Sequence, residues 1–279
     1  MSINFIKIAK MKNGILRPNS KGGEMRKLAS VLILWAVSLQ AWSQTPIPSP
    51  TSETQAVTEL SAVPESSFNW RQTSDTDGIL LYSSEVPGTK IMALKGDGLI
   101  EAPMAKVATV IVDTTRGTEW IDSLLESKVL RAFGPFEFSE YDHMGIPFPF
   151  NQFISDRDFV SHVTVETDSL NQHVTVKYTP LIDPLSPVKK NFKRGVMTCT
   201  FSMYEVCPDE TYLEAEIHCD PKGGLAAWLV NWFQGGWPET TFESLRREVA
   251  RPDIKVIPFV VTLLGLPDNP EIQTVSNKK

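Results

Sequence analysis

From Ser127 onward, apolar and polar residues alternate along the chain, which is typical of β-strands with one buried face. The alternation predicts six strands, at residues 129–133, 136–143, 158–165, 173–178, 196–206 and 212–220. Two earlier apolar runs, 79–86 and 90–95, flank the turn dipeptide Pro87-Gly88 and predict two more strands. We expect these consecutive strands to pair antiparallel in one sheet.

Helical spacing is found at three places. Pro103 suits the first turn of a helix whose apolar face lies within residues 104–111. Residues 117–126 carry Trp120 and Leu124 four positions apart, and residues 222–251 hold the longest helical segment. Strands grouped together with segregated helices predict an α+β fold, in which helices cover one face of a curved sheet.

The long helical segment is rich in aromatic residues. Its apolar positions recur at i, i+3, i+4 and i+7, the spacing of one helical face: Leu225, Trp228, Leu229 and Trp232. Pro238, which follows Gly235 and Gly236, predicts a break because proline has no backbone N–H to donate. A face this apolar needs a broad apolar surface, so we expect it to lie on the sheet.

The strand alternation also indicates which side chains face that helix. The predicted inner face carries almost no charge and consists of apolar side chains: Phe159, Val163, Met197, Phe201, Met203, Leu213 and Ile217. A filled core and a ligand pocket both fit this surface. The methionines favour a pocket, since their flexible side chains fill irregular space.

Residues 145–154 form an unusually apolar connection that includes Phe148 and Phe150. Connections between strands are normally polar. Three interpretations fit this segment: a lid over a pocket, a tip that touches a membrane, or a loop folded onto the core. Residues 179–195 hold Lys189, Lys190 and Arg194, which suit a solvated loop or a site for a lipid headgroup.

The amino-terminal region resembles a secretory signal peptide. Met25-Arg26-Lys27 is basic, residues 28–39 are mostly apolar, and Ala41 and Ser43 are small residues at the positions that signal peptidase requires. We expect residues 1–43 to be a signal peptide cleaved before Gln44, with residues 1–24 as an upstream extension. An uncleaved anchor is the alternative. Residues 44–65 are rich in Pro, Ser and Thr and predict a flexible linker, followed by one domain at 66–279.

Charge narrows the range of partners. Residues 1–43 hold seven of the 27 Lys and Arg and one of the 33 Asp and Glu, which leaves 20 against 32 and a net charge of −12. This acidic balance argues against nucleic-acid binding. The sequence lacks the usual phosphate-loop, dinucleotide, zinc-protease and hydrolase motifs, so we expect no cofactor, no metal and no catalytic residues.

Several motifs resemble a START (StAR-related lipid transfer) domain. They occur in the order expected for that family between about residues 68 and 265: Trp120-Ile-Asp, Ser155-Asp-Arg-Asp-Phe-Val160, Lys193-Arg194-Gly-Val196 and Gly224-Leu-Ala-Ala-Trp-Leu-Val-Asn231. The resemblance implies a helix-grip fold, in which a curved antiparallel sheet wraps around a long carboxy-terminal helix and encloses an apolar cavity. It also implies that residues 145–155 gate this cavity.

The resemblance points to a lipid-binding or lipid-transfer protein that holds one hydrophobic ligand and makes transient membrane contact. The signal-peptide pattern, which departs from the familiar cytosolic members of the family, predicts export to the periplasm or secretion. Some sterol-binding members place an acid and an arginine in the tunnel, where this chain has Met144 and Val163. The expected ligand-contacting residues are Phe148, Phe150, Phe159, Val163, Met197, Phe201, Met203, Leu213, Ile217, Trp228, Leu229 and Trp232. The alternative is a helix-grip enzyme, of cyclase or hydrolase type, acting on a hydrophobic substrate.

The three cysteines are too few for a disulfide framework. Counting outward from a turn near Asp209, Cys199 and Cys219 are equally distant, so we expect them to face each other across the last hairpin. A disulfide between directly paired strands would be strained, which favours two thiols.

Overall fold

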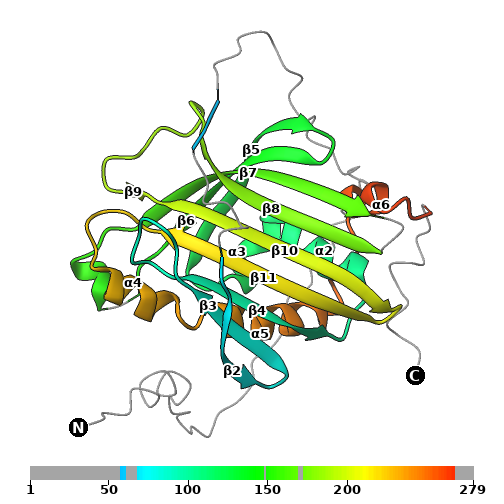
Figure 1. Ribbon diagram of the computed structural model, residues 1–279. Coiled ribbons are helices and arrows are strands. Elements are labelled where there is room, and N and C mark those ends of the chain that lie inside the picture. Colours follow the sequence, from blue (N-terminus) through cyan, green and yellow to red (C-terminus); the bar gives the residue numbers. More distant parts are fainter. Residues whose placement is uncertain (1–56, 61–67, 148, 169–171, 268–279) are drawn as a thin grey trace, which may run out of the picture. The chain divides into compact units, whose positions relative to one another are not determined.

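The computed structural model describes residues 57–60, 68–147, 149–168 and 172–267. Within these ranges, eleven strands form one sheet with the order β2-β3-β4-β11-β10-β8-β7-β6-β5, while β1 pairs with β8 and β9 with β7 (Figure 1). The strands are β1 Thr58–Glu59, β2 Arg71–Thr76, β3 Ile79–Ser84, β4 Ala93–Ile100, β5 Leu124–Gly134, β6 Glu137–Met144, β7 Arg157–Asp168, β8 His173–Ile182, β9 Lys193–Arg194, β10 Val196–Cys207 and β11 Glu210–Asp220. All pairings are antiparallel except that of β7 with the short β9.

The helices gather on one face of this sheet, and the predicted α+β class is confirmed (Figure 1). The helical elements are α2 Met104–Val112, η3 Thr114–Arg116, α3 Gly117–Trp120, η4 Phe150–Gln152, α4 Ala227–Gln234, α5 Trp237–Val249 and α6 Pro258–Leu263. Helix α5 packs on β3 and β4 and contacts α2, which in turn contacts α6. The sheet curves around α5, which is the helix-grip arrangement.

Most predicted elements are confirmed, with three differences. The helix predicted over 117–126 ends at Trp120, because Ser123 adopts a left-handed backbone with φ of 63° and β5 begins at Leu124. Strand β2 and helix α6 were not predicted. The expected signal peptide and most of the expected linker lie outside the described residues; Thr58–Glu59, near the end of that linker, forms β1 and pairs with β8.

The long helical segment is divided where Pro238 predicted, into α4 and α5. The segment that grips the sheet is α5, whose Phe242 and Leu245 are fully buried. Close approach is needed for this contact: a Cβ atom at Gly96 of β4 would lie 2.8 Å from Pro238 Cβ and 3.2 Å from Phe242 Cε2. Glycine at this position therefore lets α5 reach the sheet.

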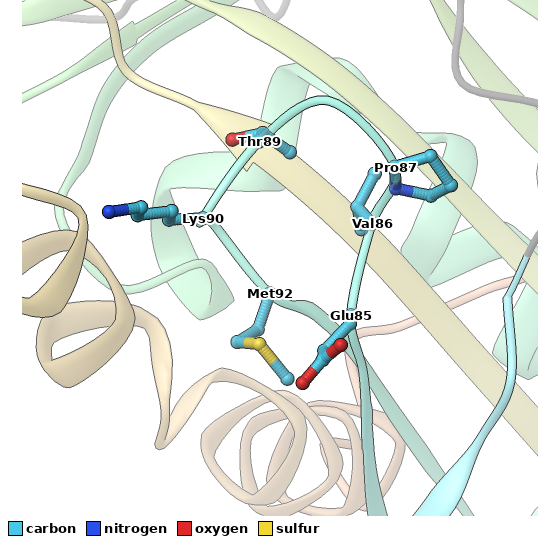
Figure 2. A pocket seen from close by; sticks show the side chains of 6 residues that line it. All are labelled: Glu85, Val86, Pro87, Thr89, Lys90 and Met92. Carbon is cyan, nitrogen blue, oxygen red and sulfur yellow. The ribbon is translucent and has the colours of Figure 1, made fainter.

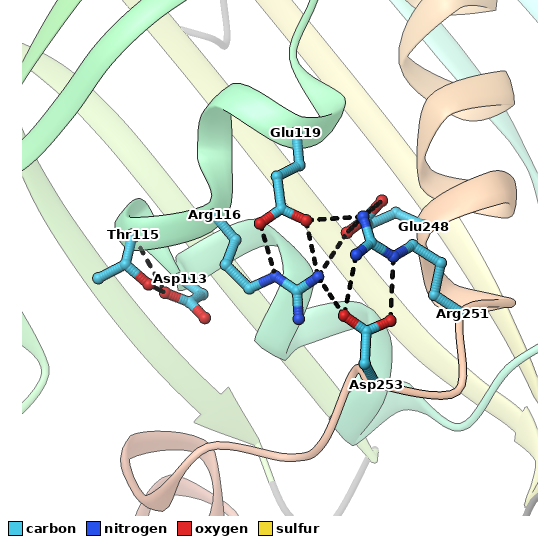
Figure 3. A network of polar contacts seen from close by, with 7 residues as sticks. All are labelled: Asp113, Thr115, Arg116, Glu119, Glu248, Arg251 and Asp253. Atoms are coloured by element: carbon cyan, nitrogen blue, oxygen red, sulfur yellow. Dashed lines mark hydrogen bonds and ion pairs between the residues drawn. The ribbon is translucent and has the colours of Figure 1, made fainter. Parts of the chain in front are cut away.

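An ion-pair network holds the carboxy-terminal end of α5 (Figure 3). Arg116 lies 2.7 Å from both Glu119 and Asp253, and Arg251 lies 2.6 Å from Glu119 and 2.9 Å from Asp253. Glu248 of α5 is buried and lies 3.2 Å from Arg251. These contacts connect η3 and α3 to the last turn of α5 and to the segment that follows it.

The cysteine prediction is wrong in register. Cys199 pairs with Ile217 across the β10–β11 hairpin, and Cys219 pairs with Met197, so the two cysteines are offset rather than opposed. Two causes add up. The turn is centred between Pro208 and Asp209, because Cys207 pairs with Glu210, and a β-bulge between Glu205 and Cys207 places an extra residue in β10, which shifts the pairs farther from the turn by one more position. Cys199, Cys207 and Cys219 form no disulfide.

Candidate ligand-binding cavity

One hollow in the described part of the chain, of about 540 Å³, is lined by six residues of the connection between β3 and β4 (Figure 2). Asn231 of α4 fixes this connection, because its side chain accepts a hydrogen bond from Met92 N at 2.9 Å and donates one to Lys90 O at 3.0 Å. Its walls come from a single surface turn, so this hollow gives a ligand little burial.

A second hollow, of about 420 Å³, lies between the sheet and the helices. Its walls come from α2, α3, β5 to β8, β10, β11, α4 and α5, and most of the lining side chains are apolar. Small-molecule sites are usually concave, largely apolar and formed by several elements. We therefore take this cavity as the candidate functional site.

Seven of the predicted contact residues lie on the inner face of the sheet, and the structure divides them into two groups. Phe159, Met197, Phe201 and Ile217 line the cavity. The other three are fully buried, have no place in the cavity wall and belong to the packed core: Val163, Met203 and Leu213. The alternation of the strands identified the face correctly. It did not locate the cavity along each strand, which depends on how the helices pack on the sheet.

The expected helical face on α4 is wrong. Trp228 is 72% exposed and Trp232 is 58% exposed, and neither these residues nor the half-buried Leu229 lines the cavity. Because α4 is separated from α5 and lies near the end of the sheet, it turns a different side inward (Figure 1). The residues of α4 that line the cavity are Val230, Phe233 and Gln234.

The apolar connection before β7 closes the same end of the cavity. Gly145, Ile146 and Ile154 line the cavity, while the ring of Phe150 lies 4.9 Å from that of Phe233 on α4 and 6.2 Å from that of Trp232. Phe148 lies outside the described residues. Asp156 holds the base of this connection by accepting from Ile146 N at 3.1 Å and contacting His143 Nε2 at 2.9 Å.

A buried cation lies at this end of the cavity. Arg157 is 3% exposed, and its guanidinium donates to three backbone carbonyl oxygens, those of Ser155, Pro221 and Lys222. Burial lowers the pKa of this guanidinium. Arg157 therefore joins the start of β7 to the segment after β11, and its donors are occupied by the chain itself.

The largest difference from the sequence analysis is an acidic pair in the cavity wall. Glu140 and Asp142 are 6% and 9% exposed, and both line the cavity. Ser127 Oγ donates to Glu140 Oε1 at 3.1 Å. The expected inner face, almost free of charge, is therefore wrong at β6. Phe138, Glu140 and Asp142 occupy alternate positions of β6, so the period of two would have placed both carboxyl groups on the same face as Phe138.

Burial of the two carboxyl groups changes their titration. Desolvation raises the pKa of Glu140 well above its usual range, and the adjacent Asp142 carboxyl raises it further. Desolvation raises the pKa of Asp142 to about 6. Two close carboxyl groups in an apolar wall cannot both ionise at low cost. The pair therefore resists losing both of its protons, and a negative charge on it has little solvent to stabilise it.

The chain matches the START domain family over residues 51–250. It belongs to that family. At the level of sequence, it is 26% identical over 179 residues to the uncharacterized protein PA1579 of Pseudomonas aeruginosa, a match that covers 64% of this chain and 85% of the relative.

Solved START structures have the same fold. A STAR-related lipid transfer protein fragment from Xanthomonas axonopodis is 23% identical, with a TM-score of 0.58 over 65% of this START chain and 99% of the fragment. Human STARD10 is 16% identical, with a TM-score of 0.59 over 67% and 74% of the two chains. Human StAR-related lipid transfer protein 5 is 18% identical, with a TM-score of 0.59 over 65% and 86%.

The described residues contain no cluster of three or more His, Cys, Asp or Glu side chains arranged to hold a metal ion. Each helix in these ranges is too short or too polar to cross a membrane.

Proposed function

We propose that this START protein is a carrier that binds one hydrophobic molecule in the cavity and transfers it between membranes without chemical change. The observation that carries the proposal is the cavity of about 420 Å³ between the sheet, α4 and α5, in a chain of the START family. Each buried methylene contributes about 0.8 kcal/mol, so a chain of about ten methylenes would gain roughly 8 kcal/mol before the costs of binding.

Native mass spectrometry of the protein purified from the exported fraction tests this function. We expect one hydrophobic molecule per chain, identified by organic extraction, because an empty apolar cavity of this size loses contacts along its whole lining. The intact mass also tests export, which we propose from the signal-like pattern before Gln44. A protein that carries no ligand and takes up none from lipid vesicles would contradict the carrier function.

We further propose that the end of the molecule formed by α4 and the η4 connection touches membranes during transfer. Trp228, Trp232 and Phe153 are exposed there, and Phe153 is 86% exposed. Tryptophan is enriched where proteins meet the membrane interface. The same elements close the cavity, so contact at this surface brings the cavity mouth to the lipid.

Replacing Trp228 and Trp232 with Ser should weaken binding to neutral lipid vesicles by at least about tenfold, because each large apolar side chain gains about 1.5–3 kcal/mol when it leaves water. The melting temperature should change little, since both rings are exposed. Vesicle sedimentation and transfer assays measure the effect. Val206→Ser, which alters a 55% exposed residue near the β10–β11 turn, is the matched control. Equal loss in both variants would argue against a membrane-docking surface.

A further inference from the structure

The acidic pair of Glu140 and Asp142 differs from other buried carboxylates of this fold. Asp158 has no exposed side-chain surface and accepts from Arg194 at 2.9 Å, while Asp183 accepts from Arg131 at 2.6 Å. Ion pairs such as these neutralise a buried charge, which is otherwise costly. Among the described residues, no cation forms an ion pair with Glu140 or Asp142, and no cation lowers the pKa of either group.

Each carboxyl group of the pair also has a free acceptor. Glu140 Oε2 and Asp142 Oδ1 are buried and have no hydrogen-bond partner, although Ser127 and the contact between the two groups satisfy part of the remaining capacity. Buried polar atoms are normally satisfied, and an unsatisfied one costs about 1–3 kcal/mol. The indole Nε1–H of Trp120, which lines the same cavity, lacks a partner too; it is a donor, so it needs an acceptor and not an ammonium group.

The missing partner must enter through the cavity, because Glu140 and Asp142 form part of its wall. A positively charged nitrogen with several N–H donors meets both needs: it neutralises a negative charge on the pair and donates to the two free oxygens. A carboxylate or phosphate at this place would add a like charge in a poorly solvated wall, which is unfavourable. A hydroxyl group would donate one hydrogen bond and leave the charge uncompensated.

The size of the cavity restricts the rest of the ligand. About 420 Å³ lies near the lower end of the range of roughly 300–1,000 Å³ found for small-molecule sites. This volume favours one hydrocarbon chain over two. Phe159 on β7, Phe201 on β10 and Ile217 on β11 belong to the apolar part of the cavity wall, where such a chain would lie.

We propose that the cavity selects a single-chain lipid amine whose ammonium group lies against Glu140 and Asp142. This inference rests on the proposed carrier function and specifies the class of ligand for the same cavity. The pair acts as the polar end of the binding site, and the apolar wall formed by β7, β10 and β11 holds the hydrocarbon chain.

Binding of three probes with the same twelve-carbon chain tests the inference: dodecylamine, dodecanol and dodecanoate, measured by calorimetry at neutral pH below their aggregation limits. We expect the amine to bind the unmodified protein at least tenfold more tightly than either other probe. In the E140Q/D142N variant we expect this preference to disappear, while dodecanol still binds, because the substituted side chains keep their shape and lose the charge.

Asp75→Asn is the control, since Asp75 is exposed on β2 and lies outside the cavity wall. It should keep the amine preference. If all three probes bind with similar affinity, or if E140Q/D142N still prefers the amine, the assignment of the acidic pair is wrong and the carrier function stands. If none of the probes binds, both the ligand class and the carrier function are contradicted.

Discussion

Replacing Phe242 with Ala should lower the free energy of unfolding by about 3–5 kcal/mol, the range found for removal of a buried aromatic ring. Phe242 is fully buried, and its ring packs against Gly96 and Gly98 of β4, where a side chain would otherwise lie. The loss removes the main apolar contact between α5 and the sheet. The cavity that remains cannot collapse easily, because the backbone of β4 is paired on both sides.

Chemical denaturation monitored by tryptophan fluorescence measures this change. Glu243→Ala is the control, because Glu243 is the next residue on α5 and is exposed. It should change the free energy of unfolding by no more than about 0.5 kcal/mol. A loss below 1 kcal/mol for Phe242→Ala would mean that α5 does not grip the sheet as described.

The E140Q/D142N variant should be more stable than the unmodified protein above about pH 6, by about 2–3 kcal/mol, since one pKa unit corresponds to about 1.4 kcal/mol. The sign follows from the raised pKa values: the folded protein holds protons that the unfolded chain has already released. At low pH both carboxyl groups are protonated in the folded and unfolded states, and they do not destabilise the fold. As the pH rises from about 4 through 6 and above, the unfolded chain releases these protons more readily, so the unmodified protein loses stability.

Denaturation of both proteins at several pH values, without added ligand, tests this expectation. The stability gap between variant and unmodified protein should be small near pH 4 and should widen as the pH rises. Asp75→Asn, which removes an exposed carboxyl group outside the cavity wall, is the control. A constant gap, or a variant that is less stable at pH 8, would show that the pair is neutralised within the protein.

The strand alternation determined much of this fold. Periods of two over residues 129–220 located six strands, and Pro238 located the break between α4 and α5, because both signals depend on local backbone chemistry. The ordered motifs around Arg157 and Trp228 identified the family. These features need no knowledge of which distant segments meet.

The position of the cavity was decided by tertiary contacts. Met203 and Phe201 share one face of β10, yet only Phe201 lines the cavity, since the packing of the helices on the sheet fills one part of this face and leaves space over another. Trp228 and Trp232 have helical spacing that fits a buried face. They are exposed because α4 docks on the β3–β4 connection through Asn231, a contact over 139 residues of sequence.

The acidic pair shows the same division between sequence and structure. The sequence alone determined that Glu140 and Asp142 would point to the same side of a strand, because side chains alternate along β-structure. Only the tertiary structure decided that this side is the cavity wall and that no arginine reaches it, as Arg194 reaches Asp158. The physical reason is that the cost of a charge depends on the solvent and partners around it, and those are set by segments far apart in the chain.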